Sequence, residues 1–73
     1  MITRDFHGWK LEDAENEIHV IVGEIRLSKQ PMTIELITGH GPIRKSAIAI
    51  LESYGLIAEP QWGNEGVICA LIE

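Results

Sequence analysis

Two glycine-containing stretches hold the side chains that could do chemistry. Asp5-Phe6-His7-Gly8 follows one short apolar run, and Thr38-Gly39-His40-Gly41 follows another. A histidine can move a proton near neutral pH, and a carboxylate can orient that histidine or bind a metal. Glycine allows a backbone to approach a ligand closely. The residue types therefore point to a site built from two loops.

The elements around the two stretches should bring them together. Residues 2–6 and 32–38 alternate as short strands do, and each is followed by a helix pattern, over residues 11–29 and from Pro42 onward. Right-handed crossovers would place both helices on one face of a sheet and both strand ends at one edge. Open α/β sheets bind ligands at that edge. We therefore expect His7 and His40 to approach each other there.

The rest of the chain completes the order βαβαββ. Residues 56–59 are expected to form a short strand that Pro60 stops, and residues 62–66 to form a turn. Residues 67–72 are apolar throughout, which predicts an interior strand buried on both sides, with Cys69 as a small buried hydrophobe. His19 lies off the apolar stripe of its helix and is expected to be solvated. The first helix stripe is predicted to be Leu11, Ala14, Ile18, Ile21, Val22 and Ile25, and the second Ile43, Ala47, Ile50, Leu51 and Tyr54, ended by Gly55.

The start of the second helix has the features of an anion site. Pro42 suits the first helical position, and the free N–H groups there attract an anion. Arg44 and Lys45 follow in the first turn, and Lys10 follows the other loop. The alternatives stay open: the cations could be a solvated helix face, and Asp5 could merely bond to local backbone. A metal held by Asp5, His7 and His40 alone would be underligated.

Size and charge limit the function classes. The 73 residues predict one domain over residues 1–73, and 45% of them are apolar, as in an ordinary globular chain. With no run near the roughly 18 apolar residues of a membrane span and no signal-peptide pattern, the expected location is cytoplasmic. The net charge of −5 argues mildly against nucleic acid. However, five of the eleven acidic residues lie in the predicted first helix, whereas four of the six basic residues flank the glycine loops: Arg4, Lys10, Arg44 and Lys45.

The two motifs together resemble a known family. Asp5-Phe6-His7-Gly8 before a helix resembles the Asp-x-His-Gly signature of the Smr (small MutS-related) domain, and Thr38-Gly39-His40-Gly41 resembles its Gly-x-Gly motif. The resemblance covers essentially the whole chain. It implies an α+β two-layer sandwich similar to the C-terminal half of translation initiation factor three. The implied four-stranded mixed sheet has the order 1-2-4-3, with strand four antiparallel and two helices on one face.

The resemblance also implies nucleic-acid binding, with DNA nicking or RNA cleavage in some members. The first hypothesis is therefore an Smr-like domain that binds DNA or RNA and hydrolyses a phosphodiester as an endonuclease. The alternative is a non-catalytic module whose loops bind RNA, a nucleotide or a protein. No cofactor follows from the residues, although a divalent metal such as Mg²⁺ stays open. The expected catalytic residues are Asp5 and His7, and the expected phosphate-binding residues are Gly39, His40, Gly41, Arg44, Lys45 and Lys10.

One surface is expected to lie away from the helices. Thr33, Glu35 and Ile37 alternate with the core residues of their strand and should lie on the uncovered face of the sheet. Beside an apolar fourth strand, that face would be partly hydrophobic, which suggests a homodimer or another partner.

Overall fold

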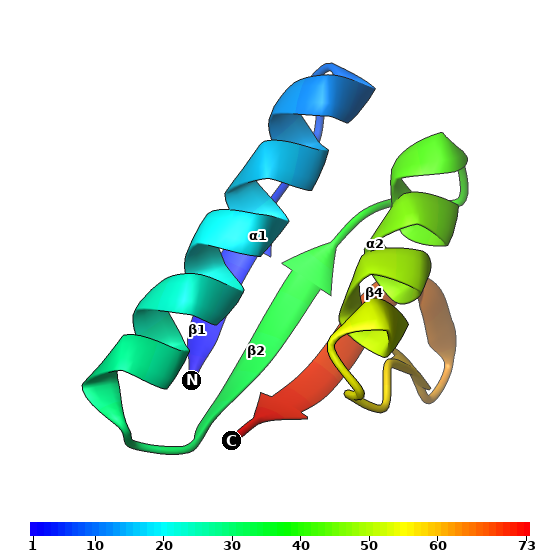
Figure 1. Cartoon of the computed structure of the whole chain (residues 1–73). Helices are drawn as coiled ribbons and strands as arrows, with labels where there is room; N and C mark the ends of the chain where they lie inside the picture. Colours follow the sequence, from blue (N-terminus) through cyan, green and yellow to red (C-terminus); the bar gives the residue numbers. More distant parts are fainter.

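The chain forms a four-stranded sheet with two helices, seen in a computed structural model that describes residues 1–73 (Figure 1). The strand order is β1-β2-β4-β3, as the resemblance implied. The predicted element order is also confirmed. The elements are β1 (Ile2–Asp5), α1 (Leu11–Ser28), β2 (Met32–Ile37), α2 (Pro42–Ser53), β3 (Glu59–Gln61) and β4 (Asn64–Ile72).

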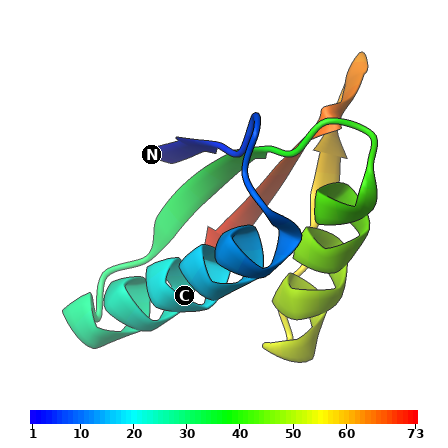
Figure 2. The same cartoon turned by 90° about the horizontal axis from the view of Figure 1, so that it is seen from above.

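The sheet is mixed, and one of its faces is covered. β1 pairs with β2 in parallel, whereas β4 is antiparallel to both of its neighbours, β2 and β3. Both helices pack on the same face, which gives the two layers of a sandwich (Figure 2). The last strand in sequence is therefore interior, as predicted. Neither helix is long and apolar enough to cross a membrane.

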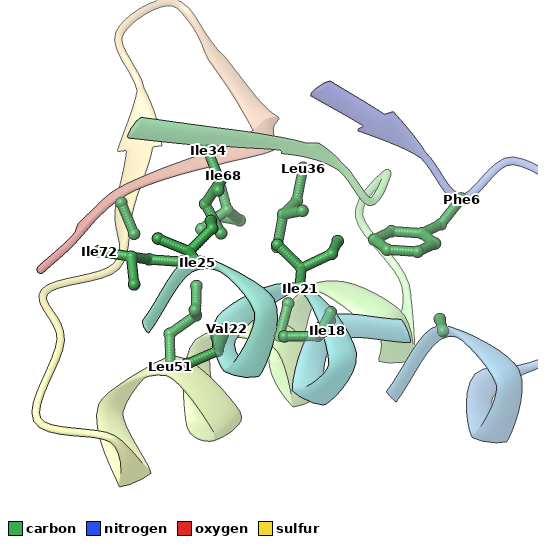
Figure 3. Close-up of a cluster of buried hydrophobic side chains, with 13 residues drawn as sticks. Phe6, Ile18, Ile21, Val22, Ile25, Ile34, Leu36, Leu51, Ile68 and Ile72 are labelled. Atoms are coloured by element: carbon green, nitrogen blue, oxygen red, sulfur yellow. The ribbon is translucent and has the colours of Figure 1, made fainter. Parts of the chain in front are cut away.

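The core lies between the helices and the covered face of the sheet (Figure 3). The predicted stripe of α1 is confirmed except at Leu11, which is 39% exposed because it is the first residue of the helix and lies at the end of the core. In α2 only Ala47 and Leu51 are fully buried, and the other residues of the stripe pack at the edge of the core. The largest buried side chains are Phe6, Ile18, Val22, Ile34, Leu36, Leu51, Ile68 and Ile72.

The C-terminal end of α2 is held against α1 by polar contacts. Nδ1 of His19 lies 2.6 Å from the Tyr54 hydroxyl, and the two rings meet edge to face. The Arg26 guanidinium lies over the Tyr54 ring and donates a hydrogen bond to the Tyr54 carbonyl. His19 is exposed as predicted, but it also joins the two helices. Gly55 follows Tyr54 as the predicted left-handed cap, and its N–H bonds to the carbonyl of Glu52.

The third strand differs from the prediction. Pro60 was expected to stop a strand at Glu59, but β3 begins at Glu59 and contains Pro60, which pairs with Ile68. An edge strand tolerates proline because one side of its ladder has no partner to which an N–H must donate. β4 likewise begins at Asn64 rather than at Val67, so the predicted turn contributes residues to the sheet.

The prediction that β4 is buried on both sides is wrong. Leu71 is 50% exposed and Cys69 is only half-buried, because both helices cover the opposite face. The residues of β2 that were expected on the uncovered face do lie there, because they alternate along the strand with the buried core residues Ile34 and Leu36. Each pairs with a residue of β4: Thr33 with Leu71, Glu35 with Cys69 and Ile37 with Val67.

The uncovered face combines apolar and acidic groups. Cys69 has Glu35 opposite it on β2 and Glu59 opposite it on β3. Burial raises the pKa of the Cys69 thiol, and the charges of Glu35 and then Glu59 raise it further. Two copies packed face to face would bring these carboxylates together, and their repulsion would oppose association. The homodimer through this face stays a prediction.

The thiol of Cys69 should react slowly with an alkylating reagent. Thiolate is the nucleophile, and a raised pKa leaves less of it at pH 8 than a free cysteine has. Glu35→Gln should lower the pKa and speed alkylation, and Glu59→Gln should do so less. The measurement is the alkylation rate of the folded protein against pH, compared with a cysteine peptide. If the pH profile of Cys69 matched that of the peptide and was unchanged by both substitutions, burial and the two carboxylates would not raise the pKa of this thiol.

Candidate functional site

The two glycine loops meet at one end of the sheet, as predicted. Asp5 at the end of β1 pairs with Ile37 at the end of β2, and the Phe6 N–H bonds to the Ile37 carbonyl just beyond. A cleft of about 260 Å³ lies between the loops. It is lined by Asp5, Phe6, His7, Gly8 and Trp9 from the first loop and by Ile37, Thr38, Gly39 and Ile43 from the second.

The first loop is held in a tight turn that leaves the His7 side chain exposed in the cleft. The Asp5 carboxylate accepts a hydrogen bond of 2.9 Å from the His7 backbone N–H, and the Trp9 N–H donates to the Phe6 carbonyl. Phe6 is buried, and the Trp9 ring packs edge-on against it with centroids 5.0 Å apart. Asp5 therefore fixes the backbone of the loop, because its bond goes to the amide of His7 rather than to the imidazole.

The second loop is joined to β4 through one carbonyl. The oxygen of Gly66 accepts the N–H groups of Thr38 at 2.8 Å and of Gly39 at 3.0 Å. Gly39 has φ +68°, a left-handed conformation that favours glycine. A β-carbon on Gly66 would lie 3.3 Å from the Gly39 Cα atom, which is tighter than most contacts of that kind. The sequence indicated only a turn at Gly66, although a glycine beside a strand pattern can signal such an approach.

The two histidines do not share the cleft. His7 lines it, whereas His40 does not. The Nε2 atom of His40 lies 3.4 Å from the position that a β-carbon of Gly66 would occupy, so the ring lies toward β4. The loops approach as predicted, but the chemistry available inside the cleft comes from one imidazole. Trp9 and Ile43 also line the cleft, although neither was predicted from the sequence to belong to the site.

The four cations near the loops differ in their availability. Arg4 is paired with Glu17 of α1, with its Nε atom 3.1 Å from the carboxylate. The Nε atom of Arg44 donates a 2.8 Å hydrogen bond to the Glu65 carbonyl, so this side chain fastens α2 to β4. Lys10 and Lys45 are exposed and form no ion pair. The two lysines are therefore the cations free to meet an anion.

The N-terminus of α2 opens beside the cleft. Gly41 is the N-cap and provides no side chain to bond to the helix, and the first turn contains no acidic residue. Pro42 has no N–H, and the Arg44 N–H bonds to the Gly41 carbonyl. Ile43, which lies between them, lines the cleft. The positive end of the helix dipole is thus left without an acidic or capping partner.

The site does not contain a preformed metal centre. Nowhere in the chain do three or more His, Cys, Asp or Glu side chains lie together as possible ligands of one ion. Asp5 and His7 share the cleft, but His40 is not part of its lining. Mg²⁺ commonly binds through one or two carboxylates together with substrate phosphates.

Comparison of the chain with protein-family models, curated proteins and solved structures gives no match. The Smr resemblance therefore rests on the two motifs and on the order and direction of the strands.

Substituting Asp5 should separate its hydrogen bond from its charge. Asp5→Ala removes the acceptor of the His7 N–H and should lower the free energy of unfolding by about 1 kcal/mol. Asp5→Asn keeps an oxygen acceptor and should retain most of that stability. Urea denaturation of the three proteins measures the difference. Equal losses in both variants would show that the charge of Asp5, rather than its acceptor, holds the loop.

Proposed function

We propose that this chain is an Smr-like domain that binds the phosphate backbone of DNA or RNA in the cleft between its two glycine loops. The observation that carries the proposal is the convergence in one cleft of His7, the left-handed Gly39 loop and the start of α2. The uncapped helix end attracts an anion, and the glycine backbone leaves room for a phosphate to approach. Lys10 and Lys45 add positive charge at the ends of the two loops.

The proposed reaction is hydrolysis of a phosphodiester with His7 as the general base. The imidazole takes a proton from the attacking water. In RNA it could instead take the proton of the neighbouring 2′-hydroxyl, and attack by that oxygen is a transesterification that leaves a cyclic phosphate. The new oxygen–phosphorus bond forms as the bond to the leaving sugar oxygen breaks, and that oxygen then takes a proton from the imidazolium or from water. Asp5 contributes by fixing the His7 backbone in the turn.

The second candidate is a module that grips nucleic acid without cleaving it. It is favoured by one observation: the Asp5 carboxylate is engaged by the His7 amide, so the imidazole has no carboxylate partner to orient it. In that case the same cleft would serve as a phosphate clamp. Cleavage and binding must therefore be tested with different variants.

Removal of the two free lysines tests binding. Lys10→Gln with Lys45→Gln should weaken the binding of single-stranded nucleic acid and make the plot of log affinity against log salt shallower by about 1.4, the value for two phosphate contacts. Fluorescence anisotropy across a salt series measures both effects. Lys29→Gln is the matched control, because Lys29 caps the opposite end of α1. An unchanged slope in the double variant would mean that the lysines are only a solvated surface.

Removal of the His7 imidazole tests catalysis. His7→Ala should abolish cleavage of plasmid DNA and structured RNA while leaving affinity nearly intact, because the phosphate is held by α2 and the lysines. Each assay is run with Mg²⁺ and with a chelator. His19→Gln is the control, since His19 lies at the contact between the helices and away from the cleft. Binding by the parent protein without cleavage under either condition would favour the non-catalytic module.

A further inference from the structure

Both tryptophans of the chain lie in segments at the end of the sheet that carries the glycine loops. Trp9 is 41% exposed and forms part of the cleft wall. Trp62 is 99% exposed, in the turn between β3 and β4. An indole side chain in a core buries a large apolar area. The Trp62 side chain buries almost no apolar area and adds little to the stability of the fold. Packing therefore does not explain why a tryptophan occupies this position.

The turn that holds Trp62 is fastened to the second glycine loop. Gly66 of β4 accepts the N–H groups of Thr38 and Gly39, and the Glu65 carbonyl accepts a hydrogen bond from Arg44 of α2. Figure 2 shows the base of the β3–β4 hairpin beside the loop that leads into α2, and the tip of the hairpin projecting away from the two helices. The four residues of chain from Gly66 to Trp62 span at most about 14 Å. Trp62 thus lies within about 14 Å of the point where Gly66 contacts the Gly39 loop. Trp9 follows β1 and Trp62 precedes β4, so the two tryptophans flank the end of β2 in the strand order.

We infer that Trp62 stacks on an unpaired base of the strand whose phosphate lies at the start of α2, and that the domain therefore selects single-stranded over continuous duplex nucleic acid. The inference rests on the proposed function. Stacking on an exposed aromatic ring requires a base whose face is free, which a duplex hides. RNA and DNA share this chemistry, and the test below separates them.

The charges around the turn fit a base better than a backbone. Glu59 and Glu65 lie on the two strands of the same hairpin and would repel a phosphate placed against it. The free cations lie instead by the loops, at Lys10 and Lys45. A strand crossing the second loop would thus keep its backbone near the lysines and turn a base toward Trp62.

Three substitutions at Trp62 test whether the ring stacks. Trp62→Ala should weaken the binding of oligouridine or oligothymidine roughly 5- to 150-fold and leave a blunt duplex of equal length unaffected. Trp62→Phe keeps an aromatic face and should recover much of the loss, whereas Trp62→Leu should not. The melting temperature should not change, because the side chain is exposed. Comparison of the two oligomers shows whether RNA or DNA is preferred.

Fluorescence gives a second readout that does not depend on affinity. In a Trp9→Phe background, Trp62 is the only tryptophan, and its emission should be quenched by the single strands but not by the duplex. The inference is overturned if Trp62→Ala binds single strands as the parent does, if Trp62→Leu recovers as much as Trp62→Phe, or if duplex quenches equally. If one of these results were found while binding still depended on Lys10 and Lys45, only the role of Trp62 would be refuted and the proposed function would stand. No binding of any nucleic acid by the parent would refute both.

Discussion

The site depends on a hydrogen-bonded contact in which one carbonyl serves two loop amides. The Gly66 oxygen accepts the N–H groups of Thr38 and Gly39, and the absence of a side chain on Gly66 lets the loop lie against the strand. The contact therefore joins β2, the start of α2 and the β3–β4 hairpin. The Gly39 loop leads directly into α2, whereas the hairpin that holds Trp62 is about twenty residues further along the chain, and this contact joins the two.

The arrangement of charge explains how an acidic chain could still offer a phosphate site. Arg4 is neutralised by Glu17, and Arg44 bonds to a backbone carbonyl, so each of these cations stabilises the packing of a helix. Lys10 and Lys45 have no such role and are the cations that could meet a ligand. With a net charge of −5, the attraction would be local and strongly dependent on salt.

Much of the fold could be predicted from the sequence because its signals are local and periodic. The stripe containing Ile18, Val22 and Ile25 defined the first helix and its buried face, and the apolar run 67–72 indicated an interior strand. The meeting of the two loops followed from the handedness of crossovers between parallel strands. The motifs suggested the strand order. The glycine loops and His7 were thus predictable as parts of one site.

Tertiary structure decided what periodicity could not show. An apolar strand reads the same whether both of its faces are covered or only one, so Leu71 and Cys69 were wrongly expected to be buried. The direction of a side chain depends on partners distant in sequence, which is why the His40 ring lies toward Gly66 and outside the cleft. The sequence by itself determined the elements and the residue types at their ends. Only packing decided which face stays open and which side chains enter the cleft, because contacts between distant segments have no local pattern.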